Sequence, residues 1–110
     1  ELPAGKLDVP GEPLEAAARR ELVEEAGLDA PQLEPLVRFH NSGGFCDEET
    51  SVFFATDLVE ATPKAVSVEE QYLTVERVRL DDVHGLIADG TITDAKTVIG
   101  LLMALRRLGR

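Results

Sequence analysis

The segment from Pro13 to Gly27 constrains the fold of this chain most strongly, because it has the start, the periodicity and the end of one helix. Proline suits the first turn of a helix, and glycine suits the position just after its last turn. The apolar residues of the segment recur at helical spacing on one side, at Leu14, Ala17, Ala18 and Leu22. The sequence therefore predicts a helix from Pro13 to Ala26.

The remaining segments predict a mixture of strands and helices. Leu33 to Phe39, Ser51 to Leu58 and Tyr72 to Leu80 have the composition or the alternation of strands. Asp81 to Ala88 suits a short helix, and Thr93 to Leu108 carries apolar residues at helical spacing. We expect the last helix to pack on the sheet. Strands interspersed with three helices indicate an α+β sandwich.

Composition bounds the class of protein. A chain of 110 residues with 44% hydrophobic residues can bury a modest core, so we expect one domain over residues 1–110. The 21 acidic residues outnumber the 11 basic ones, and the formal charge of −10 argues against general binding to nucleic acid or to an acidic membrane. An anionic substrate would then need divalent cations or a local basic pocket.

The chain lacks the features of a secreted or membrane-spanning protein. No apolar run approaches the roughly 20 residues that span a bilayer, and no signal-peptide pattern is present. The one cysteine, Cys46, cannot form an internal disulfide, which fits a reducing cytoplasm. The sequence begins at Glu1 without a methionine and inside an apparent structural element, so we expect further N-terminal strands to be missing from this chain.

Three glutamates on the first predicted helix are candidate metal ligands. Glu21, Glu24 and Glu25 are three and four residues apart and share one helical face. Each like-charged pair opposes helix formation by roughly 0.2 to 0.5 kcal/mol unless a cation compensates. Carboxylate oxygens on a rigid helix are ligands that Mg²⁺ prefers. The alternative is an ordinary solvated face with i,i+4 pairs, Glu15 with Arg19 and Arg20 with Glu24.

The wider pattern around these glutamates resembles the Nudix signature. That signature is glycine, five residues, Glu, seven residues, Arg-Glu, an aliphatic residue, any residue, Glu-Glu, any residue, glycine and an aliphatic residue. The matching positions after the first glycine are Glu12, Arg20, Glu21, Leu22, Glu24, Glu25, Gly27 and Leu28. One departure exists: six residues, not five, separate Gly5 from Glu12, so the loop Lys6 to Gly11 carries an extra residue.

The resemblance implies a Nudix-type α/β/α sandwich with a mixed sheet and a role for each matching residue. Glu21, Glu24 and Glu25 would bind Mg²⁺, with Mn²⁺ as a possible substitute, and the backbone carbonyl of Ala4 would be a further ligand. Arg20 would orient the carboxylates through Glu24. An exposed helix pair is the alternative interpretation of Arg20.

Three other segments look like those of ADP-ribose pyrophosphatases: Glu1 to Gly5, Gly43 to Glu48 and Gly90 to Thr97. The resemblance implies Mg-dependent hydrolysis of the diphosphate bond of ADP-ribose to AMP and ribose 5-phosphate, with Gly44 and Phe45 binding substrate. Those enzymes usually have proline where this chain has Gly43, and an ordinary flexible turn is the alternative there. A pyrophosphatase for another nucleoside diphosphate sugar, such as GDP-mannose, and a noncatalytic Nudix module that senses a nucleotide are the competing functions.

The resemblance implies that the general base lies on a loop before a late strand, here the predicted strand from Tyr72, and the candidates are Glu69 or, after a one-residue shift, Glu70. The resemblance favours Glu69, while both residues could be solvated loop acids. Glu24 is the further catalytic candidate, from within the signature. The resemblance also implies a homodimer.

Overall fold

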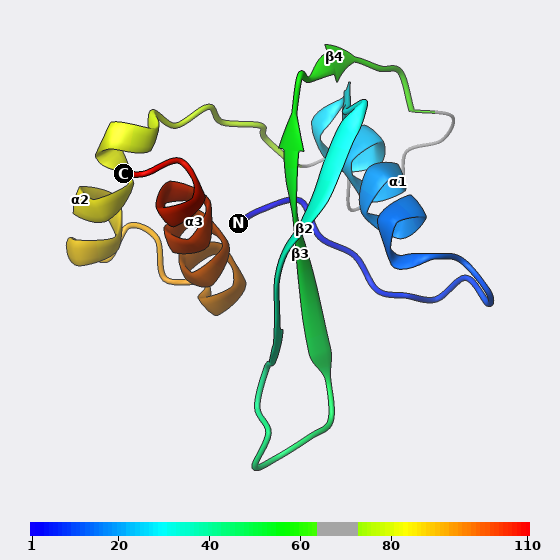
Figure 1. Cartoon of the computed structure of the whole chain (residues 1–110), viewed down its shortest axis with the longest axis horizontal. Coiled ribbons are helices and arrows are strands. Elements are labelled where there is room, and N and C mark those ends of the chain that lie inside the picture. Colours follow the sequence, from blue (N-terminus) through cyan, green and yellow to red (C-terminus); the bar gives the residue numbers. More distant parts are fainter. Residues whose placement is uncertain (64–72) are drawn as a thin grey trace. The chain divides into compact units, whose positions relative to one another are not determined.

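We describe a computed structural model of the chain for residues 1–63 and 73–110. The helices are α1 (Leu14–Ala26), α2 (Val83–Ala88) and α3 (Ala95–Arg107), with a 3₁₀ turn at Leu80–Asp82 before α2. The strands are β1 (Leu28–Asp29), β2 (Gln32–His40), β3 (Glu49–Thr56) and β4 (Val59–Glu60). Figure 1 shows these elements along the chain. The α+β class is confirmed, and the described strands form two pairs, β1 with β4 and β2 with β3.

The chain divides into two compact units. One unit contains Glu1–Leu2, Pro35–Phe54 and Val78–Arg110, and the other contains Pro3–Glu34 and Ala55–Arg77.

Helix α1 belongs to the second unit and has the predicted bounds to within one residue. It begins after Pro13 and ends at Gly27, whose left-handed backbone (φ 66°) suits glycine. The Gly27 amide donates to the Val23 carbonyl at 3.0 Å and closes the last turn. Strands β1 and β4 then pair antiparallel, with Leu28 opposite Glu60, which places β4 beside the end of the helix.

The extra residue in the loop before α1 is accommodated by a tight turn. The Glu12 amide donates to the Val9 carbonyl at 3.2 Å, with Pro10 and Gly11 between them. Gly11 has a φ of 76°, which a side chain would disfavour, and proline before such a glycine is typical of a type II turn. The turn shortens the path of the chain, so Glu12 still reaches Arg20.

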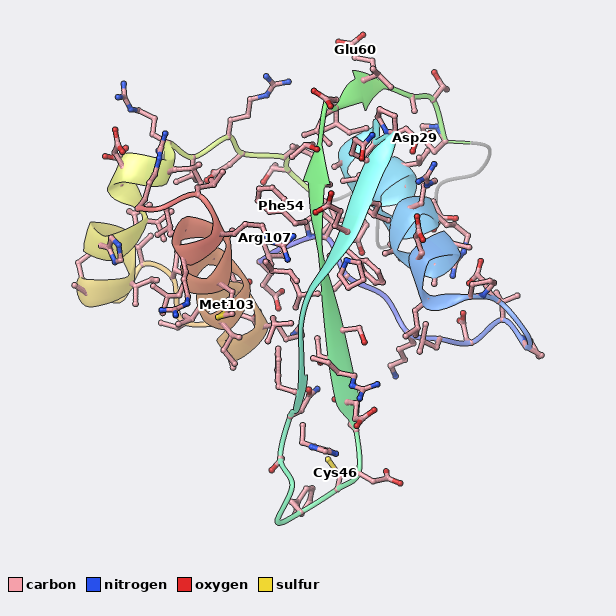
Figure 2. The ribbon with its side chains drawn as sticks, in the orientation of Figure 1. Asp29, Cys46, Phe54, Glu60, Met103 and Arg107 are labelled. Carbon is pink, nitrogen blue, oxygen red and sulfur yellow. The ribbon has the colours of Figure 1, made fainter. Side chains whose placement is uncertain are left out.

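In the first unit, α3 contacts the β2–β3 hairpin, as predicted for the last helix. The guanidinium of Arg107 lies 5.5 Å from the ring centroid of Phe54 on β3, and it donates to the Pro35 carbonyl on β2 at 3.0 Å (Figure 2). The buried side chains of this unit include Val83 from α2 and Leu105 from α3. The two predicted C-terminal helices are therefore confirmed.

The predicted strand from Tyr72 to Leu80 is wrong for its described part. Residues 73–79 have no regular structure, and Leu80 begins the 3₁₀ turn. Leu73, Val75 and Val78 are each about half exposed or more, at 51%, 59% and 47%. Alternation of apolar and polar residues makes a strand only where a neighbouring strand pairs with the backbone and a core accepts the apolar side chains, and the described residues offer this segment neither.

Across the described ranges, the longest helices have 13 residues, and none has the length and apolar character required to cross a bilayer.

Candidate metal site and substrate loop

Helix α1 presents the three predicted metal ligands on successive turns, and two of them are largely shielded from solvent. The Glu21 side chain is 15% exposed and that of Glu24 is 28% exposed. The Glu25 carboxylate accepts a hydrogen bond from the Ala4 amide at 2.8 Å. The glutamate face of α1 is therefore covered in part by the loop that precedes the helix.

Ala4 and Gly5 together form this cover. A Cβ atom at Gly5 would overlap the carboxyl group of Glu21, so a side chain at this position would force Glu21 to move from its present place. With the Ala4 amide on Glu25 and Gly5 against Glu21, the loop backbone lies directly beside two of the predicted ligands. The structure thus brings together three of the residues that the sequence singled out as ligands: Ala4, Glu21 and Glu25.

Arg20 links the loop to the carboxylates through several charged contacts. Its Nε and Nη2 donate to the two carboxylate oxygens of Glu12 at 3.2 and 3.1 Å, a bidentate arrangement. Its Nη1 lies 3.1 Å from Glu21 and 3.5 Å from Glu24. The hydrogen bond with Glu12 is the main cause that raises the pKa of Arg20, against an opposing effect of burial. Arg20 therefore links Glu12 on the loop with Glu21 and Glu24 on the helix.

The sequence identifies Glu12 only as a matching signature position, and its bidentate contact with Arg20 is visible only in the structure. The alternative i,i+4 pairs both exist, since Arg19 lies 3.6 Å from Glu15 and Arg20 3.5 Å from Glu24. Among the described residues, Arg20 lies within 4.0 Å of four carboxylates, and the pair with Glu24 is one of these contacts. The longest of the four, at 4.0 Å, joins Arg20 to Asp8. The fixed spacing of Glu12 and Arg20 in the signature is the feature of the sequence that could have predicted this contact.

Burial raises the pKa of the Glu21 carboxyl above its usual value. Arg20 lowers this pKa, whereas the negative charges of Glu25 and Glu24 raise it further. Arg20 brings one positive charge close to Glu21 and Glu24, and Glu25 lies on the same face, so one arginine does not neutralise the three carboxylates. A negative potential with oxygen donors suits a hard divalent cation, so the chemistry of the residues fits Mg²⁺.

The arrangement of the side chains is nevertheless not that of a closed metal site. Within residues 1–63 and 73–110, no three Asp, Glu, His or Cys side chains are placed to hold one ion. The Glu21 carboxylate accepts a hydrogen bond from Arg20, and the Glu25 carboxylate accepts one from the Ala4 amide. Binding of a cation would require these carboxylates to exchange protein partners for the ion. The ligand roles of Ala4, Glu21, Glu24 and Glu25 therefore stay predictions.

Gly44 and Phe45 lie in the loop between β2 and β3, near the end of the hairpin where Figure 2 labels Cys46. The Phe45 amide donates to the Ser42 carbonyl at 2.8 Å, and the Phe45 side chain is 90% exposed. A Cβ at Gly44 would meet no atom within 4 Å. Their substrate-binding role stays a prediction, and the two candidate bases, Glu69 and Glu70, lie outside the described residues.

Comparison with known proteins places this geometry in a family. The NUDIX domain family matches residues 1–99. Relatives named ADP-ribose pyrophosphatase include one from Bacillus subtilis, 39% identical over 92% of this chain and 54% of its own length. Another, from Mycobacterium tuberculosis, is 37% identical over 93% of this chain and 49% of its own length. A GDP-mannose pyrophosphatase from Yersinia pestis is 32% identical over 92% of this chain and 50% of its own length.

A solved structure described as an ADP compounds hydrolase superposes with a TM-score of 0.78 at 28% identity, over 92% of this chain and 55% of that one. The chain belongs to the Nudix family and has a Nudix fold. It spans about half the length of the curated relatives it matches.

Proposed function

We propose that this chain is the catalytic part of a Mg²⁺-dependent hydrolase that cleaves the diphosphate bond of ADP-ribose to AMP and ribose 5-phosphate. The observation that carries the proposal is the glutamate face of α1, with Glu21 and Glu25 in contact with the backbone of the Ala4–Gly5 loop. The relatives named ADP-ribose pyrophosphatase, at 39% and 37% identity, support this choice of substrate.

In this proposal, Glu21, Glu24, Glu25 and the Ala4 carbonyl hold the metal. Bound Mg²⁺ would neutralise charge on the diphosphate and make the attacking water easier to deprotonate. Arg20 keeps the carboxylates oriented. Its planar guanidinium suits this role, and its two hydrogen bonds to Glu12 hold it in position.

The proton of the attacking water passes to a carboxylate, for which Glu69 is our candidate and Glu70 and Glu24 are the alternatives. Gly44 and Phe45 would contact the substrate from the hairpin loop. This role fits their exposure, because an exposed aromatic ring can stack on a flat base or cover a sugar.

The second candidate function is hydrolysis of another nucleoside diphosphate sugar. It is favoured by the relative named GDP-mannose pyrophosphatase, at 32% identity. Both functions use the same metal and the same bond cleavage, so they differ only in the groups that recognise the base and the sugar.

A substrate panel tests the proposal directly. The protein is incubated with ADP-ribose, GDP-mannose and ADP-glucose at equal concentration with Mg²⁺, and the phosphate-containing products are separated by chromatography. We expect AMP and ribose 5-phosphate from ADP-ribose at the highest kcat/KM, and no product after chelation with EDTA. Preference for GDP-mannose would support the second candidate. Binding of ADP-ribose by calorimetry without any product would instead indicate a noncatalytic module.

A homodimer, a cytoplasmic location and a single domain over residues 1–110 stay predictions from the sequence.

A further inference from the structure

The β2–β3 loop, residues 41–48, is closed across its base by one residue, Asn41. The backbone amide of Asn41 donates to the Glu48 carbonyl at 3.0 Å, and its side-chain amide donates to the Glu48 carboxylate. The side-chain oxygen of Asn41 accepts from the Thr50 hydroxyl at 2.5 Å. An asparagine side chain both donates and accepts, so it can hold two partners at once. Asn41 thereby joins the two ends of the loop, and all of these residues belong to the same compact unit.

Inside the loop, a tight turn precedes the exposed ring of Phe45. The Phe45 and Cys46 amides both donate to the Ser42 carbonyl at 2.8 Å. Neither central residue of this turn, Gly43 or Gly44, has a positive φ. Hydrogen-bonded turns of types II, I′ and II′ require a positive φ at a central position, so this turn belongs to type I.

The two adjacent glycines make this turn costly to order. Glycine loses more conformational freedom on folding than any other residue, and a type I turn does not require it at the central positions. Among the described residues, a Cβ at Gly44 would meet no atom within 4 Å, and the nearest atom to a Cβ at Gly43 would be His40 Cβ at 3.9 Å. Packing at these two positions therefore restrains the turn little, and its order depends on the hydrogen bonds within it and at its base.

We propose that Asn41 is a positioning residue for the β2–β3 loop: by joining the two ends of this loop, it fixes the turn that presents Phe45. Its consequence for substrate affinity rests on the proposed function, in which Phe45 contacts the substrate, whereas its effect on the order of the loop does not. A loop that is ordered before binding loses less conformational entropy when it meets its ligand. Asn41 itself does not touch the substrate in this scheme.

NMR relaxation tests the effect on the loop without substrate or metal. Order parameters of the Phe45 and Cys46 amides report motion on the picosecond-to-nanosecond timescale. We expect them to fall below roughly 0.6 in Asn41→Ala, from the roughly 0.85 of a rigid backbone in the wild-type protein. Order parameters in Asn41→Ala equal to those of the wild type would overturn the inference. Urea unfolding checks that each variant keeps its fold.

Two further variants and a control separate the partners of Asn41. Asn41→Asp keeps an acceptor for Thr50 but places a second negative charge beside Glu48, so the loop should loosen as in Asn41→Ala. Adding Glu48→Gln supplies a hydrogen-bond donor to the new carboxylate and should restore the order of the loop. His40→Gln is the matched control, because it removes the adjacent exposed pair with Glu49 at 3.2 Å. An equal loss of loop order in His40→Gln would show general fraying of the hairpin and overturn the specific role of Asn41.

Kinetics connect the loop to the substrate. Asn41→Ala should raise KM for ADP-ribose by roughly 2- to 10-fold, the effect of ordering one more mobile side chain on binding, with kcat nearly unchanged. Proline suits the first central position of a type I turn, so adding Gly43→Pro to Asn41→Ala should recover most of the increase in KM. A wild-type KM in a variant whose loop is disordered would refute the contact of Phe45 with the substrate. The order parameters would still support or overturn the positioning role, even if the wild-type protein did not hydrolyse ADP-ribose.

Discussion

At the scale of residues, the environment of Glu21 conflicts with the negative charge of its carboxylate. It is 15% exposed and lies on the same face as Glu24 and Glu25. Arg20 offsets part of this repulsion, yet the pKa of Glu21 remains raised by burial and by its acidic neighbours. A group that is costly to ionise in the protein alone is expected where a cation completes the site.

Replacement of Glu21 by Gln should therefore separate stability from metal binding. Without metal, Glu21→Gln should be slightly more stable than wild type at pH 7, by roughly 0.2 to 0.5 kcal/mol for each like-charged pair that is removed. Arg20 retains Glu12 as a partner. Mn²⁺ binding and most turnover should be lost. Urea unfolding and electron paramagnetic resonance measure the two effects.

The control for this experiment is Glu15→Gln, because Glu15 is 56% exposed on the same helix and pairs with Arg19. It should leave Mn²⁺ binding and turnover unchanged.

The raised pKa of Glu21 also means that the folded protein holds this proton more tightly than the unfolded chain. Metal-free stability should then fall as the pH rises through the carboxylate range, and less so in Glu21→Gln. Wild-type Mn²⁺ affinity in Glu21→Gln would remove this residue from the ligand set.

The second residue-scale prediction concerns the general base. Glu69→Gln should lower kcat by roughly 10² to 10⁴ while Mn²⁺ binding stays intact, because a base acts on the proton and not on the metal. Glu70→Gln should cost far less. Both variants are measured at saturating Mg²⁺ across pH, where loss of the base should flatten the acidic limb of the kcat profile. A larger loss in Glu70→Gln would assign the base to Glu70, and near-normal rates in both would favour Glu24.

At the scale of elements, α1 and α3 begin differently. Helix α1 starts after Pro13 with no side-chain cap, and it relies on the fixed φ of proline. Helix α3 is capped by Asp94, whose carboxylate accepts from the Thr97 amide at 3.0 Å and from Lys96 at 3.1 Å. The hydrogen bond from the Thr97 hydroxyl is the main cause that lowers the pKa of Asp94 to about 2, and the bonds from Lys96 and the Thr97 amide lower it further. The start of α3 is therefore well defined, and the Thr97 hydroxyl oxygen there also accepts from the Leu2 amide at 3.0 Å.

The capping carboxylate should make stability depend on pH at the acidic end. Because the pKa of Asp94 is lower in the folded protein, its contribution is complete above the ordinary value of 3.8 and is lost as the pH falls towards about 2. Asp94→Ala should cost roughly 0.5 to 2 kcal/mol at pH 7, as for other N-caps. Urea midpoints at pH 7 and between pH 2 and 5 measure both quantities.

Asp94→Asn provides the matched control for the cap. Asparagine still accepts from the Thr97 amide but does not titrate, so most of the stability at pH 7 should remain while the acidic slope decreases. An unchanged slope in Asp94→Asn would assign the acid sensitivity to other carboxylates.

At the scale of the whole molecule, several large apolar side chains are exposed. They include Leu7 at 61%, Phe45 at 90% and Val75 at 59%. Apolar side chains that are exposed singly are normal on a protein surface, so they do not indicate an interface by themselves. The prediction of a homodimer is motivated by the family resemblance.

Sedimentation velocity at tens of micromolar tests this prediction, and we expect a species of twice the chain mass. Phe45→Ser should keep the fold, because the ring is almost fully exposed, and its effect on the sedimentation coefficient shows whether the hairpin loop takes part in the contact. A monomer that hydrolyses ADP-ribose at full rate would contradict the prediction that the dimer is the functional unit.

Local signals in the amino-acid sequence were sufficient to predict two of the helices. The helix ending at Gly27 and the helix near the C-terminus were predicted within one or two residues, because start signals, stop signals and helical periodicity act over a few neighbouring residues. The glutamate face of α1 followed from the same periodicity. The signature resemblance added the family, which comparison confirms.

Contacts between residues that are distant in the sequence became known only from the folded structure. The strand expected up to Leu80 did not form over residues 73–79, because a strand depends on a partner that its own sequence does not specify. The anchor of Arg20 on Glu12, the cover of Glu21 by Gly5 and the hold of Thr97 on Leu2 join residues 8, 16 and 95 positions apart. Such contacts depend on how the chain folds back on itself, and the spacing of residues along the sequence does not contain that information.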